Sequence, residues 1–436
     1  MLTQKRHLDG ETGNGKRESG FRANGPILRL SSDTLGSLAQ KYGTPLYAYN
    51  ADLIVHMYTT VGDFIKWPRL KVFYAMKANT NVHVLDELRA CNAYLDTVSE
   101  GDVDLGLKRG YPSDHMLYTA SNITRQEMRD VKSRGVMMNI GEPSLLEKYG
   151  RDFPNTEVVL RFNSEVVAGE SVKVQTTGPL SKFGFLMEGV GKANEIVSRY
   201  KLTVVGLHCH TGSGIGDIKK YYESMKRIGS LAKVENFPEL RSMDFGGGFK
   251  VPYSPDEHRI DYATFGKGLT DIYSHICENY GRELELHFEP GKYIAAESGY
   301  LLIEVNTVRD NRGKLIVGTN SGFPQLIRPV FYDAYHHIVN VTNPYGPLKT
   351  YDVAGNICEG GDFFARDRQI AEIRENDILA IENGGAYCYV MGGEYNTRPM
   401  PAEVTLRHGV PIGIRIRKRA SEIVDEMIRE SHDIKN

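Results

Sequence analysis

The sequence lacks an excess of charge of either sign. Its 436 residues carry 53 Lys and Arg against 55 Asp and Glu, a formal net charge of -2. A protein that attracts nucleic acid or an anionic membrane by overall charge is strongly basic, and this balance gives no such signal. Arguments about ligands must therefore rest on local groups of residues.

Cysteines and long apolar runs are also scarce. The five cysteines lie far apart and form no CxxC pair of the kind that binds zinc or exchanges disulfides, which indicates a reduced, cytoplasmic compartment. No segment approaches 18 uninterrupted apolar residues, and residues 1–25 are polar and glycine-rich without the apolar core of a signal peptide. We expect residues 1–25 to form a flexible tail on a soluble protein, with neither membrane nor nucleic acid as a partner.

The sequence does contain a repeated pattern of short apolar runs between Thr44 and about Val305. They are LYAY, KVFYA, YLDTV, MLYTA, EVVLRF, LTVVGLHCH, SMDF and LELHFEP. Each is followed by polar or glycine-rich residues and a stretch that can be read as a helix, and roughly eight such units over about 250 residues suit a (β/α)8 barrel. We predict an α/β barrel over residues 46–305, although an open doubly wound sheet gives a similar pattern.

After about Val305 the extended runs become shorter and are broken by turn residues, as in KLIVGTN, DILAIEN and AEVTLRHG. This pattern predicts an antiparallel β-domain over residues 306–436, which includes a charged helix at about 419–431. Residues 26–45 precede the barrel. We expect them to associate with the β-domain, with Ile27–Leu30 as an added strand.

Lys77 follows the apolar run VFYAM at the end of a predicted barrel strand. A lysine in such a position usually points to solvent. The alternative is a lysine that forms a Schiff base, because catalytic side chains lie at the C-terminal ends of barrel strands and a partly desolvated amine loses its proton more easily. The residue alone leaves both interpretations open.

Three consecutive glycines, Gly246, Gly247 and Gly248, follow the apolar run SMDF. Glycines allow backbone N–H groups to approach phosphate oxygens closely, and they equally suit a tight turn between a strand and a helix. The segment has neither the Walker lysine nor the GxGxxG spacing of dinucleotide sites. A phosphate site and a simple turn are both compatible with it.

Several further polar residues follow predicted strands. His208 and His210 share one face of a strand, and they suit ring stacking as well as metal binding; since no HExxH or carboxylate cluster accompanies them, we predict no metal. Glu289 is compatible with a solvated loop charge or with a carboxylate that keeps a pyridinium nitrogen protonated. In the β-domain, isolated residues such as Cys358 and Tyr395 are usually packing residues.

Taken together and in order, these segments resemble the pyridoxal 5'-phosphate (PLP) dependent decarboxylases with an alanine-racemase-like fold, and most closely the diaminopimelate decarboxylases. Ornithine and arginine decarboxylases are more distant members. The resemblance covers the chain from about Pro26 onward. The matching segments are FYAMKAN, SKFG, GLHCHTGS, DFGGGF, FEPGK, RPVFYDAYHHI, NICEGGD, GAYCYVMGGEYNTRP and PAEV.

The resemblance implies a PLP-binding barrel of fold type III, a C-terminal β-domain and a homodimer whose active sites lie at the subunit interface. The cofactor residues that it implies are Lys77 for the Schiff base, His210 for ring stacking, Glu289 for the pyridinium nitrogen, and Ser213, Gly246–Gly248, Gly291, Lys292 and Tyr395 around the phosphate and ring. The substrate residues that it implies are Lys292, Arg328, Tyr332, Glu359 and Tyr395, with Cys358 from the partner subunit as the proton donor.

The chain departs from the family pattern near the expected substrate end. Lys292 replaces the usual arginine and loses its planar, bidentate grip. Gly360 replaces a serine, and Gly392, Gly393, Glu394 and Met400 also differ. The resemblance implies decarboxylation of meso-2,6-diaminopimelate to L-lysine, the last step of lysine biosynthesis.

An alternative interpretation is a related decarboxylase with the same reaction and another substrate, which would be carboxynorspermidine, ornithine, arginine or a citryl-diamino acid of siderophore synthesis. A decarboxylase-like binding protein without catalysis is a further alternative. Such a protein tends to lose cofactor residues, and this chain retains Lys77, His210 and Glu289.

Overall fold

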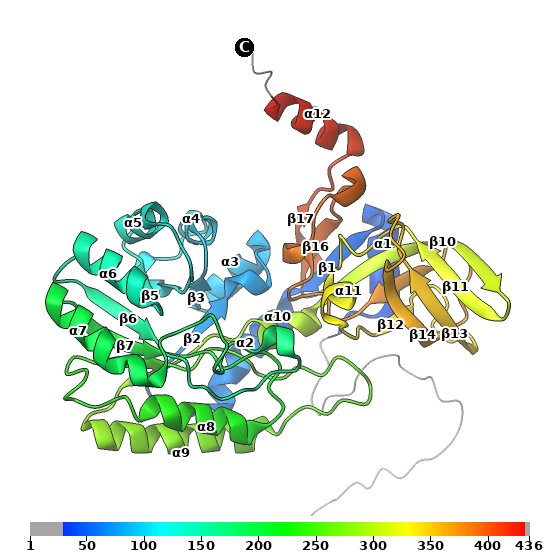
Figure 1. Cartoon of the computed structure of the whole chain (residues 1–436). Helices are drawn as coiled ribbons and strands as arrows, with labels where there is room; N and C mark the ends of the chain where they lie inside the picture. Colours follow the sequence, from blue (N-terminus) through cyan, green and yellow to red (C-terminus); the bar gives the residue numbers. More distant parts are fainter. Residues whose placement is uncertain (1–28, 432–436) are drawn as a thin grey trace, which may run out of the picture.

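The computed structural model describes residues 29–431, which form two domains (Figure 1). The first domain is a closed barrel of parallel strands, so the prediction of a barrel is confirmed. Its strands, in order around the barrel, are β2 (Leu70–Ala75), β3 (Tyr94–Thr97), β4 (Met116–Tyr118), β5 (Met137–Ile140), β6 (Glu157–Arg161), β7 (Thr203–His208), β8 (Ser242–Asp244) and β9 (Glu285–Phe288).

Helices connect the strands and cover the outside of the barrel (Figure 1). They are α2 (Ala51–Phe64), α3 (Val82–Ala90), α4 (Glu100–Lys108), α5 (Arg125–Ser133), α6 (Pro143–Asp152), α7 (Val190–Tyr200), α8 (Ile218–Gly229) and α9 (Tyr262–Tyr280). A short further helix, α10 (Lys292–Ala295), follows the last barrel strand and leads into the second domain. Local signals set their ends. In α9, the Asp261 side chain accepts hydrogen bonds from two first-turn amides, and Gly281 ends the helix at φ +90°.

The second domain is built on a nine-stranded sheet that carries two further helices, α11 (Arg328–Tyr332) and α12 (Ala420–Glu430). Its strands are β1 (Leu46–Asn50), β10 (Gly299–Asn311), β11 (Lys314–Thr319), β12 (Ile338–Asn340), β13 (Leu348–Ala354), β14 (Phe363–Ala371), β15 (Ile378–Ile381), β16 (Ala402–Arg407) and β17 (Val410–Arg415). A C-terminal β-domain is confirmed. Most of its pairings are antiparallel, but β1 with β16 and β11 with β13 are parallel, so the sheet is mixed.

The run LYAY forms β1 of the second sheet and is not a barrel strand, which corrects its assignment from the sequence. It pairs with β10 and β16. Every residue of β1 is buried, so its apolar pattern suits either sheet and only the pairing decides. Helix α1 (Ser32–Tyr42) precedes it and packs Leu35 and Leu38 against this sheet. Leu30 lies outside any strand, and residues 1–28, including the expected tail and Ile27, lie outside the described residues.

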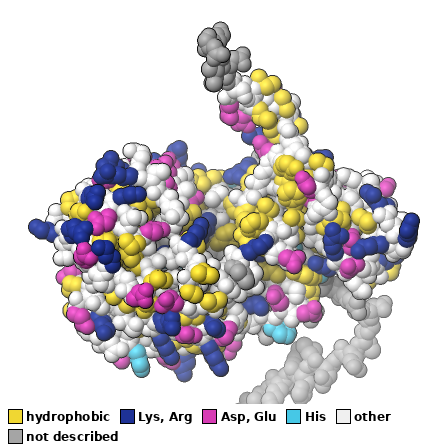
Figure 2. Space-filling view, in the orientation of Figure 1, with side chains coloured by type: hydrophobic (Ala, Val, Ile, Leu, Met, Phe, Trp, Pro, Cys, Tyr) yellow, Lys and Arg dark blue, Asp and Glu magenta, His cyan; other side chains and the backbone are white. Residues whose placement is uncertain are grey.

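One surface of the second domain is rich in apolar side chains. Figure 2 shows them gathered around β17 and α12, the helix that projects from the body of the molecule in Figure 1. The exposed members are Val410, Ile412, Ile414, Ile416, Val424, Met427 and Ile428. We call this set the β17–α12 surface. Within residues 29–431, no helix is both long and apolar enough to cross a membrane.

Candidate active site

A cavity of about 180 Å³ lies where the C-terminal ends of the barrel strands meet the second domain. Parallel strands in a barrel all end on one face, so residues far apart in the sequence converge there. Nine of the residues predicted from the sequence line this cavity: Lys77, His210, Ser213, Gly248, Glu289, Gly291, Lys292, Arg328 and Tyr332.

Lys77 lies in η1 (Met76–Ala78), a single 3-10 turn after β2, and its side chain is 37% exposed toward this cavity. Its ammonium forms an ion pair with Asp96, which is fully buried at the end of β3. Burial lowers the pKa of the Lys77 amine, but Asp96 together with Tyr387 and Glu289 outweighs burial, and the net pKa lies above the usual range. Burial raises the pKa of Asp96 to about 6. Lys77 is therefore a charged, cavity-lining lysine and not a surface lysine.

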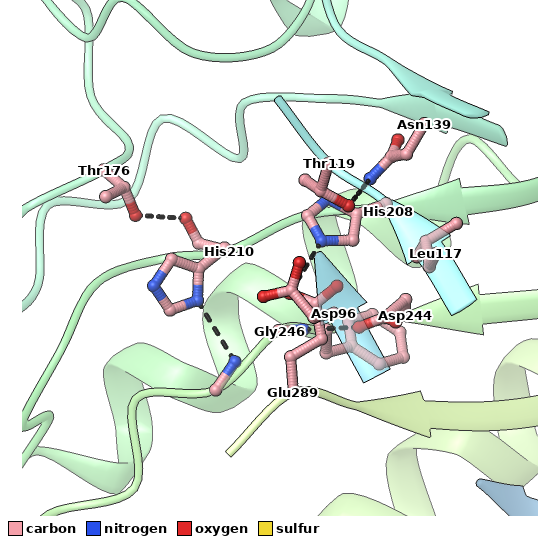
Figure 3. A network of polar contacts seen from close by, with 12 residues as sticks. Asp96, Leu117, Thr119, Asn139, Thr176, His208, His210, Asp244, Gly246 and Glu289 are labelled. Atoms are coloured by element: carbon pink, nitrogen blue, oxygen red, sulfur yellow. Dashed lines mark hydrogen bonds and ion pairs between the residues drawn. The ribbon is translucent and has the colours of Figure 1, made fainter. Parts of the chain in front are cut away.

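Glu289, at the end of β9, is 5% exposed and lies within a network of buried polar groups (Figure 3). Its Oε2 atom is 3.2 Å from His208 Nε2, while its Oε1 atom has no hydrogen-bond partner among the described residues. Burial lowers the pKa of His208 well below its usual range, so the ring is neutral and donates from Nε2 to Glu289. Burial also raises the pKa of Glu289. The unpartnered Oε1 is ready to accept a hydrogen bond from a ligand.

His208, Asp244 and Glu289 bring one ligand atom each to within 4.8 Å of one another, which is close enough to consider a metal. Asp244 Oδ1 already accepts a hydrogen bond from the Gly246 amide, at 2.8 Å. Burial, with the neighbouring Glu289, raises the pKa of Asp244 well above its usual range. His208 Nε2 already pairs with Glu289 Oε2, and Asp244 Oδ1 with the Gly246 amide, so these contacts hold Glu289 and the glycine loop in place.

The glycine loop has a packing role that limits its part in ligand binding. The Gly247 amide donates to His210 Nδ1 at 3.1 Å, and a Cβ at Gly247 would lie 2.4 Å from the carbonyl oxygen of Glu289. Gly248 has φ +97° and would clash with the Gly212 carbonyl in the same way. Of the three glycines, only Gly248 lines the cavity. The turn interpretation is confirmed at Gly247 and Gly248, and phosphate binding by this loop stays a prediction.

His210 forms one wall of the cavity. Burial lowers its pKa well below the usual range, so the ring is neutral. Because Nδ1 accepts the Gly247 amide, the proton lies on Nε2. Ser213, three residues further along the chain, lines the same cavity. A flat neutral ring beside a hydroxyl and a glycine backbone suits an aromatic ligand that carries a phosphate.

The far end of the cavity holds two buried cations. The side chains of Lys292 and Arg328 are 5% and 4% exposed. Arg328 Nε donates to His336 Nε2 at 3.3 Å, and its guanidinium carbon lies 5.1 Å from the centre of the Tyr253 ring. Burial lowers the pKa of Lys292, which is paired with Glu170. This end of the cavity can bind a carboxylate.

Three predicted site residues lie away from this cavity. Cys358 is exposed and donates from Sγ to Asn396 Oδ1 at 3.4 Å. The Tyr395 hydroxyl, on a side chain that is 46% exposed, donates to Glu359 Oε1 at 2.9 Å. Glu394, a departure from the family pattern, is also exposed and pairs with Lys418 at 3.7 Å. Together Cys358, Glu359 and Tyr395 form an exposed cluster on the second domain.

Tyr387 is a cavity residue that sequence reasoning missed. It has φ +56°, and its amide donates to the Ala78 carbonyl at 2.8 Å, which ties it to the turn that carries Lys77. Burial raises the pKa of its hydroxyl, and Lys77 acts in the opposite direction. The available signal was the segment GAYCYVMGGEYNTRP, which holds Tyr387 and Tyr395 alike. Asp96 and Glu170 were missed as well.

Known proteins resemble this chain over most of its length. The family described as pyridoxal-dependent decarboxylase, pyridoxal binding domain, matches residues 54–296. The diaminopimelate decarboxylase of Methanothermobacter thermautotrophicus is 36% identical over 408 residues, 92% of this chain and 95% of the relative. That of Aquifex aeolicus is 33% identical over 406 residues, 91% and 95% of the two chains.

A solved structure agrees with these sequence matches. The diaminopimelate decarboxylase from Helicobacter pylori, complexed with L-lysine, has a TM-score of 0.82 and 25% identity to this chain. The similarity covers 91% of this chain and 99% of that one. The likeness therefore spans both domains and the cavity between them.

Proposed function

Because this chain belongs to the diaminopimelate decarboxylase family of pyridoxal-dependent decarboxylases, we propose that it releases carbon dioxide from meso-2,6-diaminopimelate and leaves L-lysine. The observation that carries this proposal is a single cavity with Lys77 and the unpartnered Glu289 Oε1 on the barrel side and two buried cations at its far end. A substrate with a reacting amino acid centre and a distant carboxylate matches both ends.

The residues present fit PLP. Lys77 Nζ would bind the cofactor covalently, and His210 would lie against its ring. Glu289 Oε1 would gain the hydrogen-bond partner that it lacks by accepting from the ring nitrogen. The Ser213 hydroxyl and the Gly248 backbone would hold the phosphate, and Tyr387 replaces Tyr395 as the tyrosine proposed at this end because it lines the cavity. When bound, PLP supplies an electron sink for the pair released from the bond to the carboxylate.

The protein's own contribution is orientation and control of protons. Asp96 holds the proton on Lys77 Nζ before the cofactor is attached. His208 donates to Glu289 Oε2, which leaves Oε1 to hold a proton at the ring nitrogen. Walls formed by Phe249, Tyr293 and the loop at Val174 restrict water around the reacting carbon. The carboxylate carbon leaves as carbon dioxide, and one proton takes its place.

The far end would bind the second amino acid centre of the substrate. Arg328 and Lys292 would contact its carboxylate, and Tyr332 borders the same space. Two cations together suit one carboxylate, although Lys292 offers a single point charge where a guanidinium would offer two parallel hydrogen bonds. The chain would therefore bind the far carboxylate with Arg328 as the principal contact.

We further propose that the active protein is a homodimer. Cys358 and Glu359 lie outside the cavity of their own chain and are exposed, so they are available to a neighbouring copy. The β17–α12 surface gathers exposed apolar side chains such as Ile414 and Met427, which favours burial against a partner. In the dimer, the partner's Glu359 would bind the substrate's far amino group, and the partner's Cys358 would supply the proton that replaces the carboxylate.

Carbon dioxide release from a panel of amino acids tests the proposed activity. Protein loaded with PLP is incubated with meso-diaminopimelate, carboxynorspermidine, ornithine and arginine. We expect release from diaminopimelate, with L-lysine as the product, and none from the Lys77→Ala variant. Lys71→Ala is the matched control, because Lys71 lies at the other end of β2 and pairs with Glu285. Turnover of another panel member but not of diaminopimelate would contradict the proposed substrate. Absence of both cofactor absorption and turnover would contradict the proposal that the protein is an enzyme.

Mixing two inactive variants tests the shared site. Lys77→Ala and Cys358→Ala each remove one half of a site that two chains build, so a mixed dimer contains one intact site. Activity that returns on mixing supports the proposal. Full activity of Cys358→Ala alone, or no recovery in mixtures that sedimentation shows to be dimeric, would contradict it.

A further inference from the structure

A loop between β6 and α7 forms one wall of the cavity and carries Glu170. Val174 and Thr176 of this loop line the cavity directly. The loop is attached to the segment after β7, because the Glu170 amide donates to the Ser213 carbonyl at 2.9 Å. Gln175 and Gly212 also form a β-bridge between the two segments. The backbone of Glu170 is thus held beside the predicted phosphate-binding turn, while its side chain extends toward the far end.

The Glu170 carboxylate contacts both far-end cations through one atom. Its Oε1 pairs with Lys292 Nζ and lies 4.0 Å from Arg328 Nη2. In residues 29–431, no other carboxylate lies within 4.0 Å of either cation. The pairing is electrostatically important because both cations are almost completely buried and need a negative partner. Glu170 supplies that partner from within the chain.

A substrate carboxylate bound by Lys292 and Arg328 would need the same position. Two carboxylates cannot share it without strong repulsion, since like charges in a buried site oppose each other's ionised forms. Glu170 can withdraw, because its side chain is one-third exposed and lies on a loop, whereas Lys292 begins α10 and Arg328 begins α11. The acid is therefore the part of this ion-pair group that can move.

We propose that Glu170 is a specificity-determining residue that occupies the place of the substrate's far carboxylate and must be displaced when a dicarboxylic substrate binds. This inference rests on the proposed function, because it assigns Lys292 and Arg328 to the far carboxylate. A substrate with only an amine at its far end leaves Glu170 in position and is bound by it. Glu170 thus lowers the affinity for diaminopimelate and raises the affinity for diamino monocarboxylates.

Binding of pimelate (heptanedioate) to the PLP-loaded protein tests this without turnover. Pimelate carries two carboxylates and no amine, so it cannot react with the cofactor. We expect Glu170→Gln to lower its dissociation constant roughly fivefold, the effect of removing one partly screened charge contact. Glu165→Gln is the matched control, because Glu165 is equally exposed on the same loop and contacts Arg227 instead, at 3.8 Å. It should leave the dissociation constant unchanged.

The opposite outcome is also informative. If Glu170 does not occupy the place of the far carboxylate, Glu170→Gln would leave pimelate affinity unchanged or weaken it, and either result overturns the proposal. Should Glu170→Gln fold poorly or lose cofactor absorption, Glu170→Asp replaces it, since its shorter side chain withdraws the carboxylate from Arg328. The expected gain is then smaller but has the same sign.

Steady-state kinetics separate this inference from the proposed function. With Glu170→Gln, the KM for diaminopimelate should fall relative to the inhibition constant of ornithine, which has an amine but no carboxylate at its far end. If the wild-type protein releases no carbon dioxide from diaminopimelate, the proposed function fails while the pimelate result still decides the role of Glu170. If Glu170→Gln bound pimelate more tightly but kept the same preference between ligands, Glu170 would be only an electrostatic partner of Lys292. That result would contradict its role in specificity.

Discussion

Replacing Asp96 with asparagine should speed the attachment of PLP to Lys77. Asparagine keeps the shape of Asp96 and an acceptor oxygen for the lysine, but it removes the charge that keeps the Lys77 amine protonated. The pKa of Lys77 should therefore fall, because Asp96 is the strongest influence that raises it. More of the amine is then neutral at any given pH below that pKa, and only the neutral amine attacks a carbonyl.

The expected size is that of a typical ion pair that is partly open to solvent. Opposite charges about 4 Å apart attract by about 4 kcal/mol at an effective dielectric constant of about 20. The Lys77 side chain is 37% exposed, so screening leaves roughly 1–2 kcal/mol. Since about 1.4 kcal/mol corresponds to a factor of ten, the neutral amine and the rate of attachment should rise roughly tenfold.

The effect should depend on pH in one direction. The pKa of Asp96 is about 6, so the wild-type residue is ionised above that pH and protonated below it. The Asp96→Asn variant should therefore attach PLP faster than the wild type above pH 6, and the difference should shrink as the pH falls below 6. A constant ratio of rates across this range would indicate that the charge of Asp96 is not the cause.

The assay mixes cofactor-stripped protein with PLP from pH 5 to 9 and follows the visible absorption of the lysine-bound cofactor. Modification of Lys77 by an amine reagent, measured by peptide mass spectrometry, reports the same neutral amine without the cofactor. Asp86→Asn is the control, since Asp86 pairs with Arg109 outside the cavity. Equal or slower attachment above pH 6, together with unchanged modification of Lys77, would refute the reasoning.

Three further predictions concern cofactor affinity and stability. Tyr387→Phe should weaken PLP binding about tenfold, as loss of one hydrogen bond to a charged group does, whereas Tyr395→Phe should leave it unchanged. Fluorescence titration with PLP measures both dissociation constants. If Tyr395→Phe weakened binding and Tyr387→Phe did not, the assignment of Tyr387 in place of Tyr395 would be wrong. Gly247→Ala should lower the free energy of unfolding by about 1–3 kcal/mol, because its Cβ would meet the Glu289 carbonyl at 2.4 Å, and an unchanged urea midpoint would contradict this. Hydrogen bonds from His287 and Lys71 lower the pKa of Glu285 to about 2, so Glu285→Gln should destabilise the protein by about 2 kcal/mol at pH 7. That stability belongs to the ionised form, so the difference from wild type should vanish as the pH falls toward 2, and a difference that persists there would exclude a charge effect.

Local patterns predicted alternating strands and helices, and the resemblance to one family was needed to choose the barrel and its site residues. Apolar runs alternating with helical stretches predict parallel strands, and parallel strands end on one face. The resemblance placed Lys77, His210 and Glu289 in one site, and the shared face of the strand ends explains why they all line one cavity. The same reasoning misplaced LYAY, because a fully buried strand has the same apolar pattern in a barrel and in a mixed sheet.

Residues whose role depends on a distant partner were not predictable in this way. Asp96 lies in an ordinary apolar strand, and only the register that pairs it with Ala75 of β2 brings it to Lys77. Glu170 lies in a loop 122 residues before Lys292, its ion-pair partner. Neither acid belongs to a short motif, so nothing in its immediate sequence distinguishes it from a solvated charge.

The sequence alone determined the class of the protein: strand and helix periods, strand-end side chains and a glycine turn are properties of neighbouring residues, and their order is specific to one family. The tertiary structure decided which of two tyrosines in one segment reaches the cavity, which acid holds the proton on Lys77, and that Glu170 neutralises the far-end cations. The physical reason is that burial and pairing of charges depend on barrel closure and strand register, which bring together groups that are far apart along the chain.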